Sequence, residues 1–408
     1  MTGTLRYALE DDGHLPGEES HESAGLLKPP FLLILSTSGG AGHTRAAEAL
    51  LQAARLHDRP LRAEHYDSLD FTSKAFKYIY SQSYLSMVNH LPEFWGYLYA
   101  QSERKPYSKK GVLGIFDHFN YRRYVQTLLR LKPDAIVCTH FLPFLSISER
   151  AKASNITAPF FAATTDFDIH QLWIDPIVNR YYVFQEESAW QLSSKGVPRE
   201  KISVTGIPVG QEFTSITEKR IARQELEIPT ARFTILLLSG GFGVGHVKEI
   251  AQSVTSLLAS YPRQVFNLLI VCGKNESLRH ELEQSQVPPN IHLSIFAYVN
   301  NVHELMDASD LLISKSGGLT SAEAMAKHLP MIIVDPIPGQ ESRNANMIVE
   351  HHAGLLALDY HNLKYKLKCI IEDATFLQQL RDGTAELSKP HAASEIISDI
   401  YSRITRQD

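Results

Sequence analysis

Apolar residues occur along this chain as short continuous runs, and amphipathic stretches separate most of them. The strand-like runs are FLLILS, DAIVC, APFFAA, RYYVF, FTILLLS, FNLLIVC, IHLSIF, LLIS and MIIVD. Short apolar strands that alternate with helices are typical of parallel sheets covered on both faces. The pattern therefore predicts an α/β protein.

The same pattern divides the chain in two. A charged helical stretch, TEKRIARQELEI, follows a boundary near Gly206–Phe213, and a new strand then begins at Phe233. This strand and the first strand, at Phe31, both end in a glycine loop, which predicts two Rossmann-like halves facing across a cleft. We expect a disordered acidic tail (residues 1–28), a first domain (29–213), a second domain (214–390) and a last helix (391–408) that crosses back.

Composition narrows the class of protein. The 408 residues are 44% hydrophobic and 21% charged, as in an ordinary globular enzyme. A net charge of −5 argues against nucleic-acid binding by bulk electrostatics. Cys138, Cys272 and Cys369 are widely spaced, which predicts free thiols in a reducing cytoplasm and no metal site. No run resembles a signal peptide or a spanning helix, so any membrane contact is expected to be peripheral.

The loop SGGAGH, residues 38–43, follows the first strand and opens a helix expected to begin near Thr44. His43 would then lie at the positive end of that helix, where the neutral imidazole is favoured. A neutral imidazole at a ligand-binding sheet edge suits a general base. The alternative is a histidine that only caps the helix.

The loop SGGFGVGH, residues 239–246, repeats this arrangement in the second half. Its glycines allow backbone N–H groups to approach a diphosphate, although no Gly-Lys-Ser/Thr follows as in a Walker loop. A purely structural turn is the alternative.

The segment SKSGGLTSAEAMAKHLPMIIVDPIPGQESRNANMI, residues 314–348, carries the strongest signal. Its pattern predicts a strand, a Gly-Gly turn, a helix, a strand and a Pro-Gly loop that opens another helix. The glycines permit close approach of a phosphate, and Glu323, in the first turns of the helix, can accept hydrogen bonds from a sugar diol. Gln340 and Glu341 are expected on the next loop at the same sheet edge. Together these groups suit a nucleotide sugar.

Two further segments carry weaker signals. In TTDFDIHQLW, residues 164–173, Asp166 could orient a base, Asp168 and His170 would lie at the cleft edge, and a metal held by the Asp pair is disfavoured. The aromatic stretch 71–99 and the basic RKPYSKK at 104–110 could lie against an anionic bilayer. Helices packed on their own domain are the alternative for this stretch.

Taken together, these motifs resemble the diacylglycerol glycosyltransferases, which include monogalactosyldiacylglycerol synthase and the processive diacylglycerol glucosyltransferases. They are similar, more distantly, to the lipid II-forming N-acetylglucosaminyltransferase. The resemblance covers about residues 32–356 and also includes VTGIPV and GKNESL. Ala41 departs from it by interrupting the family's glycine run before His43.

The resemblance implies a GT-B fold and an inverting transfer from a UDP-hexose to diacylglycerol, with no metal or other cofactor required. It implies that His43 is the general base or positions the acceptor. The donor would be bound by Gly240, Gly241, Gly243, Gly245, Phe296, Ala297, Tyr298, Val299, Ser316, Gly317, Gly318, Leu319, Glu323, Gln340, Glu341 and Asn344. The acceptor and an anionic membrane surface would be contacted by Gly40, Trp95, Lys105, Lys109, Lys110 and His170. A peripheral place on the inner face of the cell membrane follows.

Three other functions stay open at this point. They are transfer of N-acetylglucosamine to a polyprenyl-diphosphate lipid, nucleotide-sugar 2-epimerisation, and non-catalytic sensing of a UDP-sugar. The sequence does not separate glucose, galactose and glucuronic acid as the transferred hexose. It also leaves open single or repeated transfer and the oligomeric state.

Overall fold

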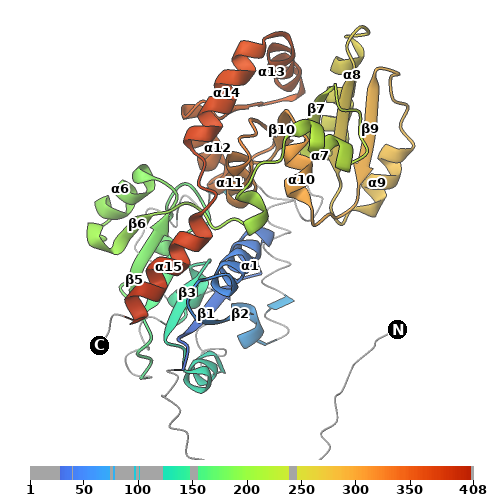
Figure 1. The fold of residues 1–408 in the computed structure, drawn as a ribbon. Coiled ribbons are helices and arrows are strands. Elements are labelled where there is room, and N and C mark those ends of the chain that lie inside the picture. The colour runs from blue at the N-terminus through green and yellow to red at the C-terminus, as the bar shows by residue number, and fades with distance from the viewer. Residues whose placement is uncertain are drawn as a thin grey trace, which may run out of the picture.

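The computed structural model describes residues 28–38, 40–73, 77–78, 96–97, 101, 123–147, 155–238 and 246–405 (Figure 1). Two six-stranded sheets organise these residues, and all pairings within them are parallel. The expected α/β class is confirmed.

The first sheet has the strand order β2-β1-β3-β4-β5-β6. Its strands are β1 (Phe31–Ser36), β2 (Arg62–Asp67), β3 (Ala135–Cys138), β4 (Phe160–Ala163), β5 (Val178–Val183) and β6 (Ile202–Val204). The second sheet has the order β12-β11-β10-β7-β8-β9. Its strands are β7 (Phe233–Leu238), β8 (Phe266–Val271), β9 (Ile291–Phe296), β10 (Leu311–Ser314), β11 (Met331–Ile333) and β12 (Gly354–Leu356).

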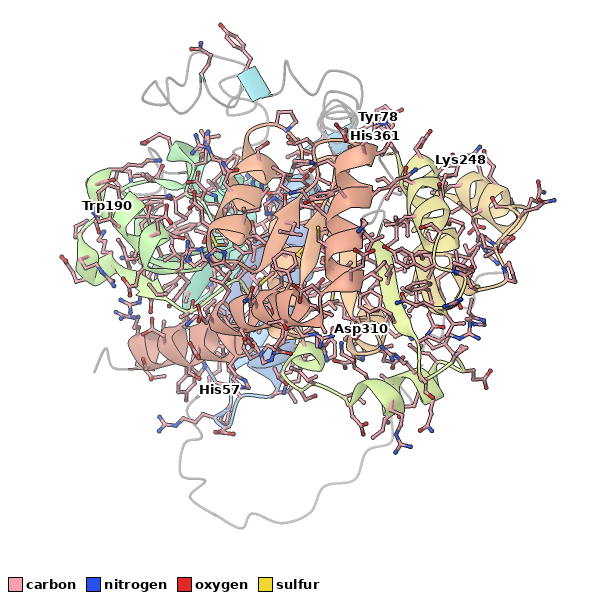
Figure 2. The ribbon with its side chains drawn as sticks, turned by 90° about the horizontal axis from the view of Figure 1, so that it is seen from above. His57, Tyr78, Trp190, Lys248, Asp310 and His361 are labelled. Atoms are coloured by element: carbon pink, nitrogen blue, oxygen red, sulfur yellow. The ribbon has the colours of Figure 1, made fainter. Side chains whose placement is uncertain are left out.

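Helices cover both sheets. They are α1 (Ala41–Arg55), α5 (Leu142–Leu145), α6 (Glu186–Ser194), α7 (Lys219–Glu225), α8 (Val247–Ala259), α9 (Glu276–Glu283), α10 (Val302–Asp307), α11 (Gly318–Ala326), α12 (Gln340–Glu350), α13 (Tyr360–Glu372), α14 (Ala374–Glu386) and α15 (Ala392–Thr405). Short 3-10 turns are η1 (Ser68–Phe71), η3 (Gln171–Trp173), η4 (Arg199–Lys201) and η5 (Gln211–Phe213). In Figure 2, Trp190 on α6 and Lys248 on α8 mark opposite edges of the molecule.

The central strands are buried along their whole length, as the continuous apolar runs predict. Every residue of β1, β3, β8 and β10 is buried. One hydrophobic cluster beside the second sheet also includes Ala46, Phe167 and Phe184 from the first half. The two halves therefore share apolar packing as well as polar contacts.

The last helix, α15, packs against the first sheet. Its residues Ile396, Ile397 and Ile400 join a cluster with Leu50 of α1 and Ile34 of β1. The Tyr182 hydroxyl donates a hydrogen bond to Asp399, at 2.8 Å. The connection after β6 and the connection before α15 pass close to each other at Gly206 and Lys389. A Cβ placed on Gly206, whose φ is +105°, would lie 2.5 Å from the Lys389 side chain.

Each sheet reverses its strand order at one internal position. The first sheet reverses between β1 and β3, and the second between β7 and β10. Loops at the carboxyl ends of strands beside such a reversal are the usual ligand-binding position in open α/β sheets. In this protein the loop after β1 leads into α1 and the loop after β10 leads into α11. These two helices contact each other across the halves (Figure 1).

Replacing Ile397 with Ala should weaken the docking of α15, because its fully buried side chain would leave a cavity. Such substitutions cost about 2–5 kcal/mol of unfolding free energy. Urea unfolding, followed through the fluorescence of buried Trp173, measures this loss. Ile216→Ala is the control, since Ile216 is 49% exposed. Equal stability of the two variants would contradict the packing role of α15.

Candidate active site

The ring of His43 is held by the loops after β3 and β4. Helix α1 begins at Ala41, three residues before the expected start, so His43 lies in its first turn. Its Nδ1 is 2.9 Å from the Thr139 carbonyl oxygen and 2.8 Å from the Thr165 hydroxyl. The Thr139 hydroxyl donates in return to the His43 carbonyl oxygen, at 2.8 Å.

This network assigns the tautomer of His43. A carbonyl oxygen can only accept, so Nδ1 carries the proton and Nε2 keeps its lone pair. Burial lowers the pKa of His43, while the Asp166 carboxylate and the hydrogen bond to Thr139 act in the opposite direction. The histidine is therefore neutral at pH 7, with Nε2 able to accept a proton.

A second histidine, His140, packs edge-on against His43. The ring centroids are 4.6 Å apart and the ring planes are 88° to each other. Its Nδ1 accepts the N–H of Leu142 at 3.0 Å, so the ring proton lies on Nε2. Burial lowers the pKa of His140 well below its usual range, and the His43 ring adds to this. Sequence reasoning missed His140 and Thr139, although both follow the buried run AIVC at the predicted ligand edge.

Asp166 faces the second half. Its carboxylate accepts hydrogen bonds from Gln340 at 2.5 Å and from Asn344 at 3.3 Å. Burial raises the pKa of Asp166, and the His43 ring and these hydrogen bonds oppose that rise. The expected part in orienting His43 is taken by Thr139 and Thr165, which contact Nδ1 directly. Asp166 acts on His43 through its charge.

The start of α11 lies against the loop after β4. A Cβ placed on Gly318 would be 2.0 Å from the Thr165 carbonyl oxygen, so only glycine permits this approach. Nearby, a Cβ on Gly42 would lie 3.6 Å from Leu319, at ordinary contact distance. The second glycine of the Gly-Gly turn therefore brings the two halves together, a role that its sequence motif did not suggest.

The first turn of α11 has no side-chain cap, since Gly317 occupies the N-cap position. Such a helix start offers N–H groups and positive potential to a phosphate. Ser316 is buried, and its hydroxyl donates to the Glu341 carbonyl oxygen at 2.7 Å. The contact of Ser316 with a phosphate stays a prediction, and in this structure its hydroxyl bonds to Glu341.

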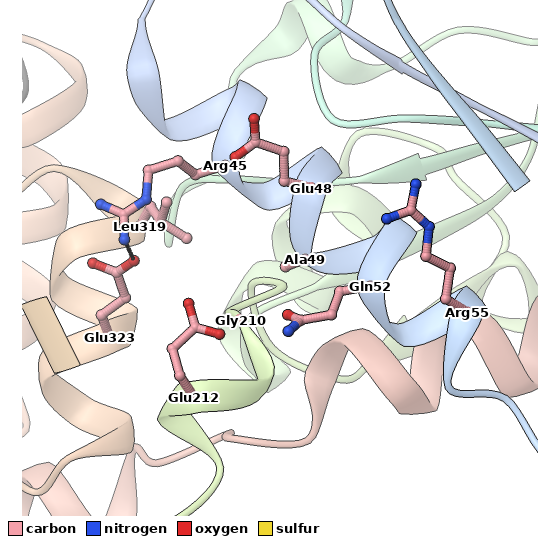
Figure 3. Close-up of a pocket in the computed structure, with 9 residues that line it drawn as sticks. All are labelled: Arg45, Glu48, Ala49, Gln52, Arg55, Gly210, Glu212, Leu319 and Glu323. Atoms are coloured by element: carbon pink, nitrogen blue, oxygen red, sulfur yellow. Dashed lines mark ion pairs between the residues drawn. The ribbon is translucent and has the colours of Figure 1, made fainter. Parts of the chain in front are cut away.

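Glu323, the predicted ribose carboxylate, projects from α11 toward the first half. Its Oε1 is 2.7 Å from the Arg45 guanidinium, and its side chain is 2% exposed. Burial raises the pKa of Glu323 to about 7, while Arg45 lowers it and Glu212 raises it further. Figure 3 shows the Arg45 guanidinium directed at Glu323, with Glu212 beside the pair.

Gln340 and Glu341 form the first turn of α12, where the sequence had predicted a loop. The Glu341 carboxylate accepts the N–H of Ile337 at 2.8 Å, and burial raises its pKa. The Asn344 amide accepts from the Phe167 N–H at 3.1 Å and donates to the Ser316 carbonyl oxygen at 3.0 Å. Gln340 and Asn344 therefore take part in joining the halves, whereas the bonds of Glu341 to Ile337 and Ser316 lie within the second half.

Arg343 of α12 adds an ion pair with Asp168, at 2.5 Å. Sequence reasoning missed Arg343, and its placement of Asp168 at the cleft edge agrees with this contact. His170 is buried, and its Nδ1 accepts the N–H of Leu172 at 3.1 Å, which caps η3. The predicted contact of His170 with the acceptor stays a prediction.

The predicted uracil segment, Phe296–Val299, begins at the last residue of β9. Ala297 lies between Phe296 and Tyr298 in the sequence. The Tyr298 side chain is 53% exposed, and the Lys274 ammonium lies 5.9 Å from the centroid of the Tyr298 ring. Gly40 is the N-cap of α1, with open space where a Cβ would stand. The predictions for Gly240, Gly241, Gly243, Gly245, Trp95, Lys105, Lys109 and Lys110 lie outside the described residues.

Within the described ranges, no group of three His, Cys, Asp or Glu side chains could hold a metal ion. No helix in those ranges is long and apolar enough to cross a bilayer. Neither observation decides the reaction.

Comparisons with known proteins agree with this geometry. Residues 43–209 match the family described as Monogalactosyldiacylglycerol (MGDG) synthase, and residues 234–398 match the Glycosyltransferase family 28 C-terminal domain. Over 382 residues the chain is 31% identical to the Processive diacylglycerol beta-glucosyltransferase of Bacillus cereus (strain B4264), covering 92% of this chain and 95% of that protein.

Two solved structures show the same fold. MurG of Acinetobacter baumannii has a TM-score of 0.59 and 13% identity, over 92% of this chain and 100% of MurG. The glycotransferase of kitacinnamycin has a TM-score of 0.61 and 12% identity, over 92% of this chain and 99% of that one.

Two parallel α/β sheets, with their switch points facing across one site, place the protein in the GT-B class of glycosyltransferases. Within that class, the chain belongs to the family of the processive diacylglycerol β-glucosyltransferases, which is related to monogalactosyldiacylglycerol synthase. It is a glycosyltransferase enzyme, as the resemblance implied.

Replacing Gly318 with Ala should push α11 away from Thr165, because the added methyl group overlaps a backbone oxygen. We expect a larger radius of gyration in small-angle X-ray scattering and at least a ten-fold loss of transfer. Gly42→Ala is the matched control for the scattering measurement, since its methyl group fits at the same interface. Unchanged scattering for Gly318→Ala would contradict the requirement for glycine.

Replacing His43 with Gln removes the base while keeping an amide near Thr139. We expect kcat to fall by about 10²–10⁴-fold, the usual contribution of a general base. Since His43 lies in the first half, UDP binding measured by calorimetry should stay within about two-fold. His57→Gln, just past the C-cap of α1, is the control.

The pH dependence of kcat tests the same group. Because the pKa of His43 is lowered from 6.5, kcat at saturating donor should stay level above that pH and fall only below it. Normal turnover of His43→Gln, or a kcat that falls with an apparent pKa above 7, would contradict its role as the base.

Proposed function

We propose that this protein transfers a hexose from a UDP-sugar to the free hydroxyl of diacylglycerol, with inversion, to form a β-glycosyl-diacylglycerol. One observation carries the proposal. A histidine with a fixed tautomer and an available Nε2 lies at the switch point of one half, directly across from an uncapped helix start and a carboxylate of the other half.

The reaction is a single displacement. Nε2 of His43 takes the proton of the acceptor hydroxyl as its oxygen attacks the anomeric carbon. The bond between that carbon and the UDP oxygen breaks, so the configuration inverts and UDP leaves with its negative charge. The N–H groups at the start of α11 stabilise this charge as it develops.

The identity of the acceptor is supported by the family. The Bacillus cereus relative is named a diacylglycerol glucosyltransferase, and the first-half family is named for a diacylglycerol product. The epimerase and sensor functions lack such support. The hexose could be glucose, galactose or glucuronic acid, and Gln340 and Glu341 are the residues we expect to contact it.

The protein is further proposed to act in the cytoplasm, at the inner face of the cell membrane. Diacylglycerol resides in the bilayer, so the enzyme must reach the bilayer surface, which we propose to be anionic. The aromatic residues 71–99 and the basic residues 104–110 suit that contact by their composition. Because α11 already provides for the departing UDP, no metal is needed, and activity should survive chelation by EDTA.

The test supplies the purified protein with diacylglycerol in mixed micelles, with and without an anionic phospholipid. Radiolabelled UDP-glucose, UDP-galactose, UDP-glucuronic acid and UDP-N-acetylglucosamine are given separately, and the label in the lipid phase is resolved by chromatography. We expect one donor to yield a glycosyl-diacylglycerol band, faster with anionic lipid, and a ladder if transfer is repeated.

Label that enters only a polyprenyl-diphosphate lipid would contradict the proposed acceptor. Conversion of UDP-N-acetylglucosamine without any lipid would indicate an epimerase. UDP binding with no product from any donor would leave the sensor function.

A further inference from the structure

The contact between Arg45 and Glu323 joins the two halves at the predicted ribose site. Arg45 lies on α1, two residues beyond His43, while Glu323 lies on α11. Their charged groups are 2.7 Å apart, with Arg45 35% exposed and Glu323 almost fully buried. A carboxylate of the donor-binding half is thus paired with a cation of the acceptor half.

Several charged groups surround this pair. Arg45, Glu48 and Arg55 of α1, together with Glu212 of η5 and Glu323, line a cavity of about 320 Å³ between the halves (Figure 3). At the C-cap of α11, Lys327 is paired with Asp307 of α10. On α14, which packs against α11, Arg381 is paired with Asp310.

Among these groups, Arg45 is the one that favours an ionised Glu323. Burial raises the pKa of Glu323, and Glu212 raises it further, whereas Arg45 lowers it. The resulting pKa of about 7 means that the carboxylate is poised between its two forms at neutral pH. Without Arg45 the protonated form would predominate at that pH.

The two forms differ in what they can bind. An ionised carboxylate has about four lone-pair positions and can accept from both hydroxyls of a vicinal diol, whereas a protonated one carries a hydroxyl of its own. Arg45 contacts Oε1, and a single such contact leaves acceptor capacity on the carboxylate. A charged acceptor also forms the stronger hydrogen bonds.

We propose that Arg45 is a positioning residue for the donor: it reaches across from the first half and holds Glu323 as the charged acceptor of the ribose diol. This inference rests on the proposed function, in which Glu323 binds that diol. Donor recognition by the second half then depends on docking of the first half. The carboxylate becomes a full acceptor only when α1, which also carries His43, lies in place.

The test measures UDP binding by calorimetry from pH 6 to 9 for the intact protein and four variants. In the intact protein, affinity should rise as the pH increases through about 7, since the raised pKa of Glu323 means that its charged form accumulates only there. Arg45→Ala should move this midpoint up by at least one pH unit and weaken UDP binding at pH 7 by about five-fold or more, in proportion to the ionised fraction of Glu323. Arg45→Lys keeps a cation at this position, so its midpoint should lie close to that of the intact protein.

The remaining two variants are controls. Arg55→Ala removes a cation from the same helix and the same cavity, and it should leave the profile unchanged. Glu323→Gln should lose the change in UDP affinity near pH 7. The pH dependence that remains in this variant reports the ionisation of the UDP phosphate, whose pKa is about 6. At saturating donor, kcat of Arg45→Ala should stay near that of the intact protein, so its effect appears in KM.

The outcomes separate the two claims. A profile for Arg45→Ala that matches the intact protein, while Glu323→Gln binds UDP weakly, overturns the role of Arg45 alone. Unchanged UDP binding by Glu323→Gln overturns the diol role of Glu323, and with it this part of the proposed function. Equal shifts of the pH midpoint in Arg45→Ala and Arg55→Ala would mean that any cation in the cavity has the same effect, and this would also overturn the inference.

Discussion

The arrangement of this protein depends on the close approach between Gly318 at the start of α11 and the carbonyl oxygen of Thr165. No side chain fits between these backbones, so the start of α11 reaches the loop that supports His43. Asp166 and Asp168 extend the contact to α12 through Gln340, Asn344 and Arg343. This contact brings the proposed base on one half beside the proposed donor site on the other.

The same geometry explains why the polar groups between the halves can serve two purposes. Asp166, Asn344 and Glu323 are buried and would be costly to leave unpaired. Across the interface each finds a partner in the other half, which holds the halves together. In the proposed function, an entering donor exchanges some of these contacts for its own hydroxyls, so substrate binding and domain docking would use the same side chains.

Much of the fold followed from the sequence, because continuous apolar runs between helices have few structural solutions. The positions of His43 and Glu323 in helices that begin at a glycine loop after a buried strand were also predictable, whereas their roles stay predictions. The partners of these residues were not predictable, because Thr139, His140 and Arg45 meet them only through contacts between distant segments. Asp166 illustrates the limit: its motif suggested a partner for His43, whereas the fold directs its carboxylate to Gln340 and Asn344. The start of α12 at Gln340 was missed because the Pro-Gly signal predicts a loop.

A crystal structure of the protein with UDP tests the central claim, that one site is built from both halves, most directly. The account predicts the diphosphate at the start of α11 and the ribose diol on Glu323, with Nε2 of His43 facing the terminal phosphate from the other half. UDP bound away from α11, or bound with His43 turned from it and Gly318 separated from Thr165, would contradict the account.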